Sequence, residues 1–135
     1  MPERTRRFWL SSDPGQGYAV WFRLLSSAVA GAGLALSFTW LYSPLYAWAS
    51  VGVLMMMVFS ARPRTAYFCG HVHALAFVLT SVPWIAEVLA VHGGMPLLAG
   101  WGVLLLIATV WGMLTGGFAW GVNRIARSSL GRWPR

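Results

Sequence analysis

The segment Val82–Pro96, with the sequence VPWIAEVLAVHGGMP, decides how this chain folds. It closes a long apolar run and carries Glu87, the only acidic residue after Asp13. The run then breaks at Gly93-Gly94, and a second long apolar run starts at Pro96. Two apolar runs joined by a glycine-rich turn predict two membrane-spanning helices with a tight connection between them.

The composition of the whole chain points the same way. Its 135 residues suffice for one domain, and 58% are hydrophobic while only 10% are charged. Soluble domains have about a quarter of their residues charged. Nine Trp, seven Phe and four Tyr are many for this length, and such side chains concentrate where membrane meets water. We therefore predict an all-α integral membrane protein.

The net charge of +7 does not indicate nucleic-acid binding. All ten basic residues are arginines, and they fall in short clusters between long apolar runs. A nucleic-acid-binding protein would gather them on one polar face. The single cysteine, Cys69, excludes an internal disulfide. The polar stretch after the basic start also argues against a cleavable signal peptide.

The apolar runs divide the chain into a four-helix membrane domain, 24–122, between basic tails at 1–23 and 123–135. The expected spans cover residues 24–42, 45–61, 65–91 and 97–122. Pro83 lies inside the third span and predicts a kink near Leu79 to Pro83, because proline removes a backbone hydrogen bond.

The arginines set the expected orientation of these spans. All ten lie in the two tails or in the loop between spans two and three. Arginines concentrate on the cytoplasmic side of membrane proteins. We expect both termini in the cytoplasm, and the turns at 40–42 and 92–96 on the outer side.

Small residues spaced four apart predict close contacts between helices. They are Ser27, Gly31 and Ala35 in the first span, and the pairs Gly112 with Gly116 and Gly117 with Gly121 in the fourth.

Few side chains suggest chemistry. Glu87 is either functional, as an acid near a membrane span, or an ordinary interfacial carboxylate. His71 and His73 point about 200° apart on a helix and cannot share a metal. Cys69 fits a small buried residue better than a nucleophile. His92 is either a surface residue or a head-group contact. We predict no catalytic residue, metal or cofactor.

Several short motifs resemble one family of bacterial enzymes. Trp84-Ile85 followed by Gly93–Pro96 resembles the end of the third membrane helix of apolipoprotein N-acyltransferases. Ala35–Phe38, Leu45–Trp48 and Arg62–Ala66 resemble its first helix end, second helix start and basic inner loop. Order and spacing agree over about three quarters of the chain.

The resemblance implies an enzyme that moves an acyl chain from a phospholipid to the N-terminal cysteine of a lipoprotein. It implies multi-pass residence in the bacterial inner membrane, with chemistry at the outer face. In that family a Glu-Lys-Cys triad on a nitrilase-like domain forms the acyl-enzyme. No position here matches the triad, so we expect the catalytic domain to be absent from this chain. Either a separate partner chain carries that domain or the chain is a truncated form.

The resemblance also suggests where membrane phospholipid would be met. Around Trp84 the family often has a tyrosine where this chain has Ala86 or Glu87. The candidates for lipid or acyl-chain contact are Trp84, Glu87, His92, Gly93, Gly94, Met95 and Pro96.

Three hypotheses for the function of the chain follow from the residues and the resemblance. Whether the chain itself is an enzyme is left open by the sequence. The first is the membrane domain of an acyltransferase, dependent on a partner. The second is a non-catalytic lipid-binding or scaffolding protein. The third, a small transporter or channel, is disfavoured because the spans lack a polar lining.

Overall fold

The computed structural model describes residues 14–38 and 44–130, which consist of helices and short connections. The helices are α2 (Pro14–Leu36), α3 (Pro44–Phe59), α4 (Pro63–Ser81), α5 (Trp84–Val91) and α6 (Leu97–Leu130). The described residues contain no strand, so the all-α prediction is confirmed for them.

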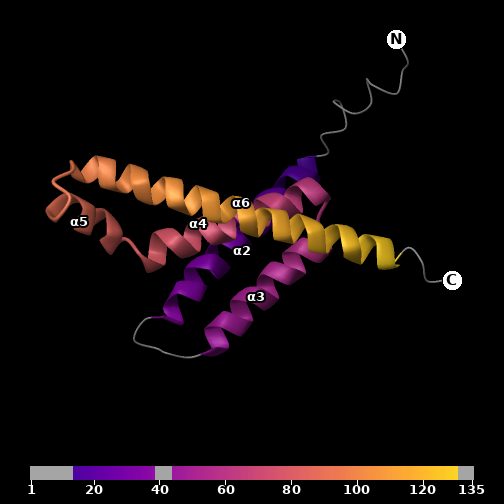
Figure 1. Ribbon diagram of the computed structural model, residues 1–135. Helices are drawn as coiled ribbons and strands as arrows, with labels where there is room; N and C mark the ends of the chain where they lie inside the picture. The colour runs from indigo at the N-terminus through magenta and orange to yellow at the C-terminus, as the bar shows by residue number, and fades with distance from the viewer. Residues whose placement is uncertain (1–13, 39–43, 131–135) are drawn as a thin grey trace, which may run out of the picture.

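Helix α4 is the centre of the arrangement and packs against α2 on one side and α6 on the other. The chain runs back and forth, so that the start of α2 and the end of α6 lie at the same end of the molecule (Figure 1). The α5–α6 turn lies at the opposite end, and α3 packs mainly on α2 and α4.

The contact between α2 and α4 uses the small-residue face predicted for the first span. Ser27, Gly31 and Ala35 are all buried. A Cβ on Gly31 would lie 2.0 Å from the carbonyl oxygen of His73, so the two backbones are nearly in touch. His73 also places Nδ1 3.2 Å from the Ser27 carbonyl oxygen. This predicted helix contact is confirmed.

The contact between α4 and α6 uses one of the two predicted glycine pairs. A stripe of buried residues runs along α6: Gly100, Leu104, Ala108, Gly112, Gly116, Ala119 and Asn123. Gly116 lies against Tyr67 and Gly70 of α4, whereas the Cβ positions of Gly117 and Gly121 are open. The second pair does not mediate a helix contact within the described residues, because the buried face of α6 is one residue away.

Small residues fill the interior and large apolar residues face outward. Of the thirteen hydrophobic residues buried among the described ones, eight are alanines. The exposed face of α6 instead carries large apolar side chains: Leu105, Leu106, Ile107, Val110, Trp111, Met113, Leu114 and Phe118. Soluble proteins bury their large aliphatic residues, whereas helices packed in lipid bring small residues together. This packing is typical of membrane helices and suggests a membrane protein.

The first helix differs from its predicted span at both ends. α2 starts at Pro14, inside the predicted tail at 1–23, and ends at Leu36, six residues before Tyr42. Its stretch long and apolar enough to cross a membrane is Ala19–Leu36. Hydropathy measures only which part of a helix fits into lipid, so the polar first turns of α2 were missed. The remaining tail residues, 1–13, lie outside the described part.

The predicted kink is confirmed at Val82-Pro83. Here α4 ends and α5 begins, and the two helices are bent by 54°. Val82 N–H still donates to the Val78 carbonyl, at 3.1 Å. Pro83 has no N–H to offer to the Leu79 carbonyl, so the helical ladder stops there.

Two helices, α2 and α6, meet the length and apolarity needed to cross a membrane. The bent pair of α4 and α5 makes a third if it counts as one span. α3 is apolar but has only 16 residues, about 24 Å at 1.5 Å per residue. That is shorter than the roughly 30 Å hydrocarbon core, so the count of four spans stays a prediction.

Candidate functional site

The residues predicted to contact lipid lie on α5 and on the turn that follows it. Trp84 and Glu87 are exposed on the same face of α5, since they are three residues apart. Val88 and Val91 continue this face and are also exposed. The opposite face carries Ala86, which is fully buried.

Close packing on α6 holds α5 in place. A Cβ on Gly100 would lie 2.6 Å from the carbonyl oxygen of Ala86, so the two helices touch through their backbones. Such an approach is possible only with small residues at the crossing. It turns the exposed face of α5, with Trp84 and Glu87, away from the other helices.

The Gly-Gly-Met-Pro turn reverses the chain between α5 and α6. Gly94 has φ of +65°, a left-handed conformation that suits glycine at a helix end. Backbone N–H groups of Gly93 and Met95 donate to the Leu89 carbonyl at 3.1 and 3.4 Å. Pro96 directly precedes α6, and its carbonyl accepts from Ala99 N–H at 2.8 Å. The motif is thus a compact helix connection.

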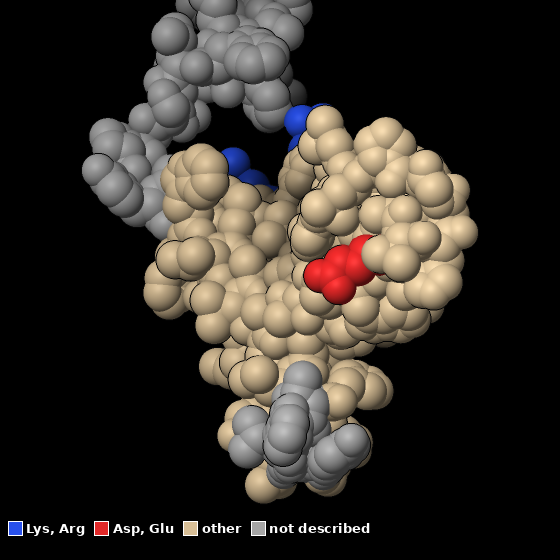
Figure 2. All heavy atoms as spheres, turned by 90° about the vertical axis from the view of Figure 1, so that its left-hand side faces the viewer, with Lys and Arg blue, Asp and Glu red and all other residues tan. Residues whose placement is uncertain are grey.

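Glu87 lies exposed at the end of the molecule where α5 turns into α6 (Figure 2). It is the only acidic residue among the described ones, and it lies in the first turn of α5. A carboxylate is favourable there because the N–H groups at a helix N-terminus carry partial positive charge. His92, at the other end of α5, is exposed as well. Trp84, Glu87 and His92 are thus all exposed.

The other titratable candidates lie elsewhere and apart from one another. His73 is buried against α2, whereas His71 faces α6, next to Gly112, and stacks on Tyr67. The two histidines therefore point to different neighbours, as their spacing predicted. Cys69 is buried in a cluster with Leu54 and Val58. Among the described residues, no three His, Cys, Asp or Glu side chains come close enough to hold a metal.

A polar cluster at the end of α3 was not predicted from the sequence. Buried Asn123 of α6 donates from Nδ2 to the Val58 and Ala61 carbonyls, at 2.6 and 3.0 Å. Arg127 donates to the same Ala61 carbonyl. Arg23 of α2 donates to the Met57 carbonyl at 2.9 Å. Carbonyls at a helix end lack intrahelical partners, and these side chains supply them.

The comparisons with known proteins agree with the resemblance found in the sequence. Residues 30–134 match the model of the apolipoprotein N-acyltransferase N-terminal domain. The chain is 26% identical over 107 residues, 76% of its length, to the apolipoprotein N-acyltransferase of Vibrio parahaemolyticus. That alignment covers only 21% of the relative. The chain belongs to the family of apolipoprotein N-acyltransferase N-terminal domains.

Proposed function

We propose that this chain is the membrane-embedded helical domain of an apolipoprotein N-acyltransferase system in a bacterial inner membrane. The observation that carries the proposal is the family match over residues 30–134. The domain would present phospholipid and lipoprotein to a catalytic domain, which transfers the acyl chain to the N-terminal cysteine of the lipoprotein.

The proposed membrane domain spans residues 24–122 and crosses the bilayer four times, with α3 as a short second span and α4 plus α5 as a bent third. The arginine positions support a cytoplasmic location for both termini. Arg23, Arg62 and Thr65 line one pocket, and Arg127 reaches the Ala61 carbonyl beside it. Glu87 lies on α5, at the end that faces the viewer in Figure 2. The gathering of the arginines at one end fits the positive-inside rule.

A division of labour with a catalytic domain follows from the residues themselves. All ten basic residues are arginines, so these 135 residues contain no lysine and cannot supply a Glu-Lys-Cys triad. The exposed face of α5 and the turn at 92–96 would lie at the outer leaflet, where the acyl donor is found. A nitrilase-like catalytic domain would act there.

Labelling of single cysteines tests the topology. In a Cys69→Ala background, His92→Cys should react with a membrane-impermeant maleimide in intact spheroplasts. Ser128→Cys, exposed near the end of α6, should react only after the membrane is opened. Labelling of both positions from the same side would overturn the four-span arrangement, because α6, the helix between them, would then not cross the membrane.

Acyl transfer to a lipopeptide with a free N-terminal cysteine tests the function. The purified chain in phospholipid micelles should give no N-acylated product alone. Adding the chain to a preparation of the catalytic domain should raise the yield of product. Transfer by the chain alone would contradict the proposed division of labour, and no effect on the catalytic domain would favour a lipid-binding or scaffolding role.

A further inference from the structure

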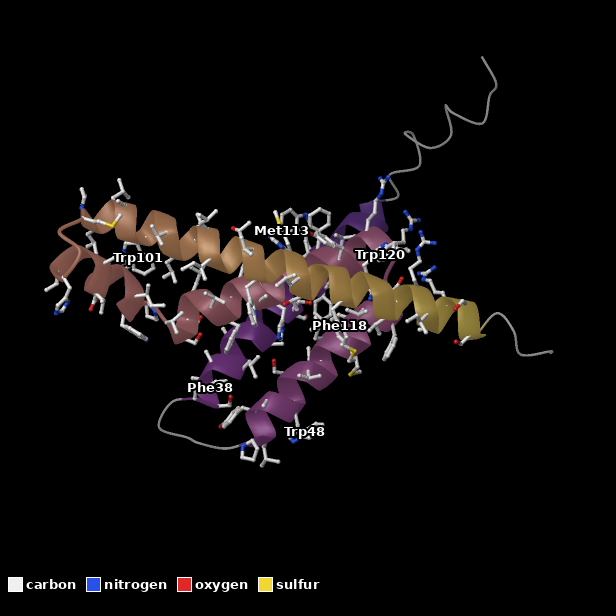
Figure 3. All side chains as sticks on the ribbon, in the orientation of Figure 1. Phe38, Trp48, Trp101, Met113, Phe118 and Trp120 are labelled. Atoms are coloured by element: carbon white, nitrogen blue, oxygen red, sulfur yellow. The ribbon has the colours of Figure 1, made fainter. Side chains whose placement is uncertain are left out.

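An open groove lies between α4 and α6, away from the α5 face. It has a volume of about 370 Å³ and is lined by Arg64, Tyr67, Phe68, Gly117 and Trp120. Four of these five residues offer apolar or aromatic surface, and the fifth is a cation. Trp120 lies on α6 near the arginine-bearing end of the molecule (Figure 3).

The positive charge of the groove is concentrated at one end of it. Arg64 stands in the first turn of α4, where backbone N–H groups add partial positive charge and no side chain caps the helix. The guanidinium carbon of Arg124 lies 5.2 Å from the centre of the Trp120 ring, a cation–π arrangement. Arg64 lines the groove and Arg124 stacks on its wall.

Gly117 lines the groove without a side chain and so leaves space in it. A Cβ at this position would meet no atom within 4 Å, so glycine is not required there for packing. One residue earlier, Gly116 is required, since its Cβ would lie 2.9 Å from the Tyr67 carbonyl oxygen. Gly117 therefore keeps the floor of the groove low between the Tyr67 and Phe68 side and the Trp120 side.

We propose that this groove binds one anionic phospholipid of the leaflet at the arginine-bearing end, with the phosphate head group at Arg64 and Arg124 and an acyl chain along Gly117. The charge favours an anion, and the aromatic walls favour a hydrocarbon chain. Basic pockets between membrane helices bind anionic lipid head groups in this way. The site lies at the other end of the molecule from Glu87 and is separate from the proposed acyl-donor surface. The proposal relies on the membrane embedding inferred above.

Native mass spectrometry of the full chain in detergent, titrated with phosphatidylglycerol or phosphatidylethanolamine, tests it. The chain should bind one phosphatidylglycerol more tightly than phosphatidylethanolamine. Arg64→Gln should weaken phosphatidylglycerol binding about fivefold, the usual effect of one arginine on an anionic lipid. Gly117→Leu should fill the groove and remove the tight site, leaving only weak, non-selective lipid adducts.

Two matched variants serve as controls. Gly102→Leu introduces the same side chain on α6 at another open position, where a Cβ also meets nothing within 4 Å. Arg62→Gln removes the same charge two residues from Arg64, from a residue that lines a different pocket. Both variants should keep the wild-type affinity for phosphatidylglycerol within about twofold. This is a small difference in binding free energy, since a tenfold change in affinity corresponds to about 1.4 kcal/mol.

Two results would overturn the lipid site. One is wild-type phosphatidylglycerol affinity in Gly117→Leu, and the other is an equal loss in Arg62→Gln and Arg64→Gln, which would indicate diffuse charge attraction. Extraction of the wild-type chain from membranes by alkaline carbonate would instead contradict the embedding proposed above. The two failures are therefore distinguishable.

Discussion

Gly31 and Gly33 lie two residues apart on α2 and meet opposite surroundings. A Cβ on Gly31 would press into the His73 backbone, whereas a Cβ on Gly33 would meet nothing within 4 Å. Gly31→Ala should therefore push α2 from α4 and destabilise the fold by about 1–3 kcal/mol, the usual cost of overpacking. Gly33→Ala should be neutral or stabilising, by up to about 1 kcal/mol, because alanine favours helix. Thermal unfolding in micelles measures both.

Asn123 holds the end of α3 against α6 through two hydrogen bonds to backbone carbonyls. Asn123→Leu keeps the volume roughly constant but leaves the Val58 carbonyl without this donor. The Val58 carbonyl still accepts from Ala61 N–H and the Ala61 carbonyl still accepts from Arg127. We therefore expect a loss of about 1–2 kcal/mol, the net contribution of the two lost hydrogen bonds. Chemical unfolding in mixed micelles would measure it, with Ser128→Ala as an exposed control on the same helix. A stability equal to that of the control would show that the hydrogen bonds contribute nothing.

The residues at these helix contacts show which interactions could be predicted from the sequence and which could not. The Ser27–Gly31–Ala35 face was predicted because small residues at four-residue spacing have a known use in lipid. Asn123 was missed because its partners are backbone carbonyls of a helix more than sixty residues away, which no local pattern reveals. Gly117 was assigned to a helix contact because spacing alone does not distinguish a buried face from its neighbour.

At the scale of whole elements, the position of α5 depends on its contact with α6. Gly100→Leu should drive α5 away from α6, because even the Cβ would lie 2.6 Å from the Ala86 carbonyl oxygen. Spin labels at the exposed positions Val88 and Leu105 would report a longer or broader distance distribution by electron paramagnetic resonance. Gly102→Leu, with open space around its Cβ, should leave the distribution unchanged. Equal distributions in all three proteins would mean that another contact positions α5.

The sequence predicted that the helices exist, but it predicted less well the residues at which they begin and end. Pro83 gave the break between α4 and α5 because the missing N–H is a local property of the residue. The start of α2 at Pro14 was not evident, since the polar residues there continue a helix without belonging to its apolar run. The candidate contact residues on α5 were placed together because they are close in sequence, and their exposure follows from the burial of Ala86.

At the scale of the whole molecule, most of the buried hydrophobic residues are alanines and many large apolar side chains are exposed, a distribution typical of helices in lipid. The described arginines gather at one end, where Arg23 and Arg127 also satisfy carbonyls of α3 and its following turn. The residues from which the orientation was predicted thus also supply hydrogen bonds to carbonyls at the end of α3 and in the turn after it. The sequence predicted the first role from charge distribution, and the second needed the packing of α2, α3 and α6.

An arginine introduced at two equally exposed positions of α6 tests the surrounding solvent. Leu114 is 65% exposed and Ile125 is 68% exposed, but Ile125 neighbours Arg124. Leu114 lies eleven residues earlier, about 16 Å deeper along the helix at 1.5 Å per residue.

In water, replacement of either residue by arginine would change the stability of the protein very little. In lipid, Leu114→Arg should cost about 2.5–3.5 kcal/mol of insertion free energy, whereas Ile125→Arg should cost little, because its side chain reaches the interface. The yield of membrane-inserted protein should fall sharply for the first variant and stay near wild type for the second. Equal yields would mean that the exposed face of α6 does not lie in hydrocarbon.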